Sequence, residues 1–164
     1  MLLILSGLSY SLYVTLQQDP GKGIVTCTKD GSCFWTAHIH AFIPVTICGQ
    51  NYRLPIETAP LTGPHTHEEK NIAHWHDRLP YNNETKRITE TKSLTLGAFF
   101  DEIKVPFSEN EIAGKKSGDS CEDGNPGSVK MLINGVGTTT NPAYIWKNQD
   151  VISITTMGSV HIEM

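Results

Sequence analysis

The sequence lacks the features that mark several common classes of protein. It has 13 basic and 17 acidic residues in 164, and the basic ones form no cluster, so a nucleic-acid partner is not expected. The His-Glu-x-x-His motif of zinc peptidases and the Gly-x-Ser-x-Gly elbow of serine hydrolases are both absent. The cupin spacing also fails, because Pro44 stands where a ligating Glu would follow His40.

The first 18 residues lack any charged side chain. As a helix they would span about 27 Å, close to the thickness of a bilayer core. There is no basic stretch and no small-residue cleavage site, so residues 1–18 are predicted to be an uncleaved membrane anchor. A signal peptide and a buried helix or strand are the alternatives. Residues 19–26, which include Asp19-Pro20-Gly21, are predicted to be a linker into a single extracytoplasmic domain at 27–164.

Cysteine is also scarce, at four residues: Cys27, Cys33, Cys48 and Cys121. An even number behind an apolar N-terminus suggests two disulfides and a location outside the cytosol. Cys27 and Cys33 bracket a turn-rich loop that could close locally, which would leave Cys48 for Cys121. Three connectivities are possible, and the sequence does not choose among them. Thiolate metal ligation is the alternative, although Cys-x5-Cys is not a usual zinc spacing.

Histidine, by contrast, is concentrated: six of the seven fall into three copies of one spacing between positions 38 and 76. The pairs are His38-Ile-His40, His65-Thr-His67 and His74-Trp-His76. Random placement would give roughly 0.3 such pairs. In an extended strand, residues i and i+2 point to one face about 7 Å apart, so both imidazoles of a pair can converge on one ion. The spacing predicts a site for a metal that accepts neutral imidazole, with copper preferred and zinc second.

The three pairs stand in different contexts. The first lies in residues 36–47, where apolar side chains alternate and turn both histidines away from the core, while Pro44 implies an edge or a bulge. The second follows the turn signal Gly63-Pro64 and is predicted on a loop. The third lies between Ile72 and Asp77 and is compatible with a short strand.

Glu68 and Asp77 adjoin the second and third pairs. Either could bind the metal or orient a ligating imidazole through its second ring nitrogen, and a solvated surface role is the alternative for each. Glu69 and Tyr81 complete the candidate acids and bases of this window, but no spacing ties any of the four to a metal. No catalytic residue is therefore assigned, and we expect binding without turnover.

The remaining pattern predicts a β-rich α+β domain of β-grasp-like order. The predicted elements are a hairpin around Cys48-Gly49-Gln50-Asn51, a long His-bearing loop at 57–84, a strand at 88–94, a short helix capped by Thr95, a polar surface excursion at 108–127, a hairpin at 129–136 turning at Asn134-Gly135, and a closing strand at 151–155. Asn83-Glu84-Thr85 is also a glycosylation sequon, consistent with an extracytoplasmic location.

Residues 36 to about 157 resemble a family of small, mostly uncharacterised archaeal and bacterial proteins that are membrane-anchored or secreted. The resemblance rests on the paired histidines, on Leu94-Thr95-Leu96-Gly97-Ala98-Phe99-Phe100 and on the hairpin Val129-Lys130-Met131-Leu132-Ile133-Asn134-Gly135. It implies a metal role outside the cytoplasm but transfers no activity. The chain departs from that family at His76, where the family more often has an acid.

Three functions fit these observations. The first is an extracytoplasmic carrier or buffer of copper or zinc, anchored to the membrane by the N-terminal segment or serving as an accessory subunit of a membrane complex. The second is a metal-dependent enzyme, either a hydrolase or a copper oxidoreductase, since a three-His site with an open position can support catalysis. The third is a structural surface module in which metal secures the long loop.

Overall fold

The fold is that of a computed structural model that describes residues 23–56 and 60–158. The predicted anchor at 1–18 and the first half of the predicted linker, residues 19–22, lie outside these residues. Among the described residues 49% are in strands and 8% in helices, so the β-rich α+β class is confirmed, while the β-grasp arrangement stays a prediction. No helix among the described residues is long and apolar enough to cross a membrane.

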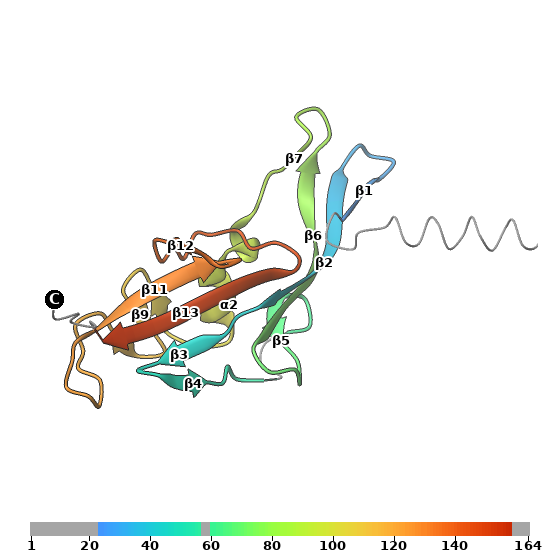
Figure 1. The fold of residues 1–164 in the computed structure, drawn as a ribbon. Coiled ribbons are helices and arrows are strands. Elements are labelled where there is room, and N and C mark those ends of the chain that lie inside the picture. Colours follow the sequence, from blue (N-terminus) through green and yellow to red (C-terminus); the bar gives the residue numbers. More distant parts are fainter. Residues whose placement is uncertain (1–22, 57–59, 159–164) are drawn as a thin grey trace, which may run out of the picture.

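A mixed ten-stranded sheet dominates the molecule (Figure 1). Its central path runs β12-β11-β13-β2-β6-β5, with β1, β3, β4 and β7 pairing at its sides. The bounds are β1 (Ile24–Cys27), β2 (Cys33–Phe42), β3 (Val45–Ile47), β4 (Gln50–Tyr52), β5 (Gly63–Thr66), β6 (Ile72–Asn82), β7 (Arg87–Ile88), β11 (Gly127–Ile133), β12 (Val136–Thr138) and β13 (Asp150–Gly158). The first strand begins inside the predicted linker and pairs with β2.

Strand β2 confirms the predicted alternation. Ala37, Ile39 and Ala41 are buried on one face, while the two histidines between them point to the other. Strand β2 ends before Ile43-Pro44, and β3 begins directly after them. Both strands run parallel to β13. The proline thus lies at a break between two strands, each paired on both sides, rather than at the predicted edge.

The predicted loop at 57–84 is wrong, because most of it forms two strands. Residues 63–66 form β5 at the edge of the sheet, and residues 72–82 form β6, the longest strand described. On the face of β6 that looks away from its histidines, Trp75 is fully buried and stacks on Trp35 of β2, with ring centroids 5.7 Å apart. This apolar face fixes the side of the sheet on which the histidines must lie.

The predicted helix is confirmed as α2 (Leu96–Glu102). Thr95 is its N-cap, and its side-chain oxygen accepts a hydrogen bond from the Ala98 N–H at 3.2 Å. Leu96, Phe99 and Phe100 are buried in the core with β13. The strand predicted at 88–94 is wrong: only β7 is extended there, and a 3₁₀ turn, η1 (Lys92–Leu94), leads into the helix.

The C-terminal hairpin forms as predicted between β11 and β12. Asn134 and Gly135 have φ values of 52° and 82°, as a type I′ turn requires. The predicted closing strand is β13, which lies inside the sheet between β11 and β2. The predicted surface excursion contains a separate three-stranded sheet of β8 (Phe107–Ser108), β9 (Glu111–Ile112) and β10 (Lys115–Lys116).

Both predicted disulfides form. Cys27 pairs with Cys33 across the β1–β2 turn, and Cys48 in the β3–β4 turn pairs with Cys121 in the loop before β11. No cysteine is free, so the alternative in which thiolates bind metal is wrong.

Candidate metal centre

The six predicted ligands meet on one face of three adjacent strands. Strand β6 lies between β2 and β5 and is antiparallel to both. In this register His74 stands directly opposite His40 on one side and His65 on the other, while His76 stands opposite His38. Directly opposed residues point to the same face of a sheet. Pairing therefore places five of the six imidazoles on one surface, and the sixth follows one residue beyond β5.

The imidazoles form two groups of three. One consists of His38, His40 and His74, and the other of His65, His67 and His76. Within each group the candidate ligand atoms all lie within 4.8 Å of one another. Nitrogen atoms bound to one ion at about 2.0–2.1 Å lie closer together than that, so small side-chain rotations would complete either group. The structure thus brings together all six histidines predicted from the sequence. The first two His-x-His pairs each stay within one group, and the third pair is divided between the groups.

Several ring nitrogens of this cluster are buried without a hydrogen-bond partner. Both nitrogens of His74 and Nε2 of His76 are in this state, which is costly for polar atoms in a protein interior. The His65 ring is fully buried, its Nδ1 lies 3.0 Å from the Gly63 carbonyl, and its Nε2 lies 2.8 Å from Nε2 of His67. A metal ion would satisfy one nitrogen of each ring that it binds, and the Gly63 carbonyl would orient the His65 ring from behind.

Hydrogen bonds between residues far apart in the sequence hold these strands in place. The His40 N–H donates to the Asn148 side chain at 3.0 Å, and the His40 carbonyl accepts from the Gln149 N–H at 2.7 Å. Asn71, in the turn between β5 and β6, accepts from the Leu54 N–H and donates to two carbonyls, those of Ile43 and Tyr52. The ligand-bearing strands are therefore fixed independently of any ion.

Burial favours the neutral form of four of the six histidines. Together with the neighbouring histidines, which contribute less, it lowers the pKa of both His74 and His76 to about 4. Burial also lowers the pKa of His40 and His65. Imidazole binds metal only when it is deprotonated, so at neutral pH the site does not have to release protons from these four rings before binding.

The same shifts predict that the metal-free protein loses stability in acid. Between about pH 6.5 and pH 4 the unfolded chain binds more protons than the folded one, because unfolded histidine titrates near 6.5. The free energy of unfolding should therefore be constant above about pH 6.5 and fall as the pH drops towards 4. Urea denaturation of chelator-treated protein at several pH values measures this. A His74→Gln/His76→Gln variant should show a shallower fall, and an equally steep one would contradict the assignment.

Among the described carboxylates, that of Glu69 lies beside the cluster. Its Oε2 is 3.6 Å from His74 Nε2, beyond hydrogen-bond distance, and its side chain is half exposed. Asp77 accepts a hydrogen bond from the Arg78 N–H, and strand alternation directs it to the face away from His76. Glu68 is exposed. The orienting roles predicted for Glu68 and Asp77 stay predictions, and the structure adds Glu69, which the sequence analysis named only as a candidate acid or base.

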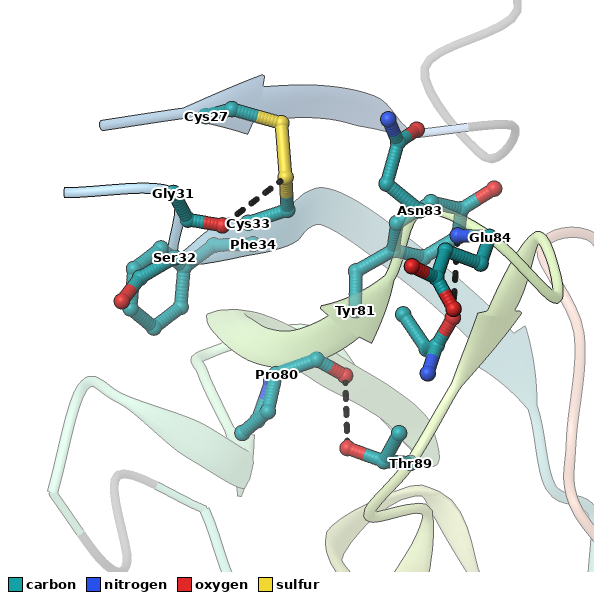
Figure 2. Close-up of a pocket in the computed structure, with 11 residues that line it drawn as sticks. Cys27, Gly31, Ser32, Cys33, Phe34, Pro80, Tyr81, Asn83, Glu84 and Thr89 are labelled. Carbon is teal, nitrogen blue, oxygen red and sulfur yellow. Dashed lines mark hydrogen bonds between the residues drawn. A yellow bond between two sulfur atoms is a disulfide. The ribbon is translucent and has the colours of Figure 1, made fainter. Parts of the chain in front are cut away.

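A hollow of about 720 Å³ lies at the far end of the β2–β6 pair (Figure 2). The Cys27–Cys33 disulfide, Phe34, Pro80 and Tyr81 line it, together with the exposed sequon residue Asn83. None of the histidines lies there, so it is separate from the metal centre.

No protein-family model matches the chain, and neither does any curated protein or solved structure. The geometry of the histidine cluster is therefore the feature of this protein that indicates a function.

Proposed function

We propose that this protein is an extracytoplasmic transition-metal-binding protein that holds copper, or secondarily zinc, on its histidine face. The observation that carries the proposal is the convergence of six imidazoles on one sheet face, with buried ring nitrogens that have no protein partner. Buried polar groups are nearly always satisfied, so ring nitrogens in this state are best explained as ligand atoms. Carriage or buffering of the ion, alone or as an accessory subunit of a membrane complex, is the role we assign.

The donor set supports copper over zinc. Both groups consist of imidazoles alone, without a carboxylate or a thiolate. Copper(II) exceeds zinc in affinity for such nitrogen sites in the usual order of divalent ions, although zinc accepts three histidines as well. An oxygen-preferring ion such as magnesium or calcium would find no suitable ligands in these groups.

Three further features support a location outside the cytoplasm. Both disulfides are of the kind that persists in oxidising compartments. The apolar residues 1–18 and the resemblance to anchored or secreted proteins point the same way.

The test is elemental analysis of full-length protein purified without a chelator or a histidine tag. We expect stoichiometric copper or zinc, and copper should displace zinc in a competition titration. A folded protein that takes up neither ion at micromolar concentration would contradict the proposal. Loss of both ions on treatment with a chelator, followed by rebinding, would separate exchangeable carriage from a permanently closed structural site.

Removal of the neighbouring carboxylate should weaken binding modestly. Glu69→Gln is expected to lower copper affinity by about 10-fold, in the lower part of the range for groups that act on a ligand rather than on the metal. Glu84→Gln is the matched control, since it changes the same functional group in the turn between β6 and β7, where no histidine lies, and it should leave the affinity unchanged. Competition with a chromophoric chelator measures both, and equal losses in the two variants would remove the role assigned to Glu69.

An enzyme is the second candidate, because three imidazoles leave a coordination position open on a bound ion. Hydrolysis of esters, phosphoesters and peptides, and oxidation dependent on O2 or peroxide, should be assayed with metal-loaded protein. Turnover that Glu69→Gln abolishes at full metal occupancy would replace the binding-only proposal.

A further inference from the structure

We infer that the six histidines form one dinuclear centre, with one ion on each group of three, and that the two ions share a small bridging anion of the hydroxide, azide or peroxide class. This inference rests on the proposed function, since it concerns the same histidines. It adds the number of ions, the way the ligands are divided between them and the kind of molecule that the centre takes up.

The division of ligands follows from the order of the strands. Strand β2 contributes the complete pair His38 and His40 to the first group, and His74 of β6 completes it. Residues 65–67, at the end of β5, contribute a complete pair to the second group, and His76 of β6 completes that one. The central strand is therefore shared, and its two histidines belong to different groups. The third His-x-His pair thus serves to join two sites rather than to make a third.

The number of imidazoles exceeds what one ion uses. Protein sites for zinc or copper take three or four such ligands at about 2.0–2.1 Å. A single ion on either group would leave three histidines without a metal, among them a β6 histidine with buried, unpartnered ring nitrogen. Because His74 and His76 both carry such nitrogens and belong to different groups, one ion on each group would give both rings a partner.

The two groups are in direct contact. The rings of His67 and His74, which belong to different groups, have centroids 4.2 Å apart, and those of His38 and His76 are 4.5 Å apart. These separations match those within a group, such as 4.4 Å between His38 and His40. No other side chain is interposed between these ring pairs, so two bound ions would be close neighbours. Paired ions in proteins lie about 3.5–4 Å apart when one small ligand bridges them.

The bridging ligand has to come from outside the protein. Neither group contains a carboxylate, and each ion would have three nitrogens and an open position. Glu69 is the nearest carboxylate to His74, but it is half exposed and lies at 3.6 Å from an imidazole nitrogen. Opposite His76 in β5 stands Gly63, where a Cβ would meet no atom within 4 Å. This leaves room beside the second group, while the exposed His38 opens the first group to solvent.

The experiment is copper(II) titration of the full-length chain, followed by electron paramagnetic resonance. We expect two copper ions per chain, with an integrated spin signal well below two because neighbouring copper(II) ions couple. Azide should then bind at one per two coppers and produce a new charge-transfer absorption band. Two coppers with two independent spins, or one azide per copper, would overturn the shared bridge.

Variants that disable one group at a time provide the matched comparison. His40→Gln removes a ligand from the first group, and His67→Gln removes one from the second. Each should retain one copper per chain, with an ordinary uncoupled spin signal and no azide band of the wild-type kind. Loss of both ions from either variant would contradict two separable sites. The number of azide ions bound per two coppers is measured on the wild type. It therefore tests the shared bridge even if a variant does not fold.

The outcomes also separate this inference from the proposed function. A chain that binds no copper contradicts both. A chain that binds one copper per molecule keeps the metal-binding function and overturns the dinuclear centre. Coupled copper that becomes uncoupled in Glu69→Gln would make that carboxylate the bridge and would overturn the external anion.

Discussion

The double variant His74→Gln/His76→Gln is expected to lose all stoichiometric copper. These two residues lie on the central strand β6, and each belongs to a different group of three, so one double substitution takes a ligand from both groups. Changing the pair on a strand that flanks β6, such as His38 and His40 of β2, removes ligands from one group only. The loss of affinity at each site should exceed the 10–100-fold range typical of groups that only orient a ligand.

Equilibrium dialysis against buffered copper, followed by elemental analysis, measures this effect. Arg78→Gln is the control, because Arg78 lies on the same strand and face but packs over the Phe34 ring, 4.8 Å from its centroid. The control should bind copper as the wild type does. Retention of either ion by the double variant would show that the assignment of β6 histidines to both groups is wrong.

Removal of the Cys48–Cys121 disulfide should destabilise the fold more than removal of Cys27–Cys33. The first bridge closes a loop with a sequence separation of 73 residues and the second one of 6. In the chain-entropy model these loops correspond to about 4 and about 2 kcal/mol of stabilisation at 25 °C. Denaturant titration of Cys48→Ala/Cys121→Ala and of Cys27→Ala/Cys33→Ala compares them at constant temperature. Equal losses would mean that native contacts rather than loop closure dominate.

The elements that the sequence predicted correctly depend on local interactions. Thr95 caps α2 because its own side chain bonds an N–H three residues on, and Asn134-Gly135 turns the hairpin because both residues accept a positive φ. The alternation in β2 is equally local, since every second side chain meets the core. None of these features needs a distant partner to be recognised.

The elements that the sequence missed depend on distant partners. Gly63-Pro64 is a turn signal, yet here it begins β5, and a proline is tolerated because β5 is an edge strand that pairs only with β6. At residues 89–94 the sequence predicts a strand that the structure does not form. There the Thr89 N–H bonds the Pro80 carbonyl, the ladder with β6 ends, and the chain closes a 3₁₀ turn at Leu94 instead of continuing as a strand.

For the candidate site too, local features could be predicted from the sequence and long-range ones could not. The sequence by itself determined which six residues can bind a metal, because the His-x-His spacing fixes two imidazoles on one face of any extended strand. It also determined that the cysteines could pair, although not which with which. Only the tertiary structure decided that β6 lies between β2 and β5, and therefore that one sequence pair is divided between two groups while the others stay whole. Strand order and register are set by pairing between residues far apart in the chain and by burial of the opposite face around Trp75, and neither is encoded in the spacing of the histidines.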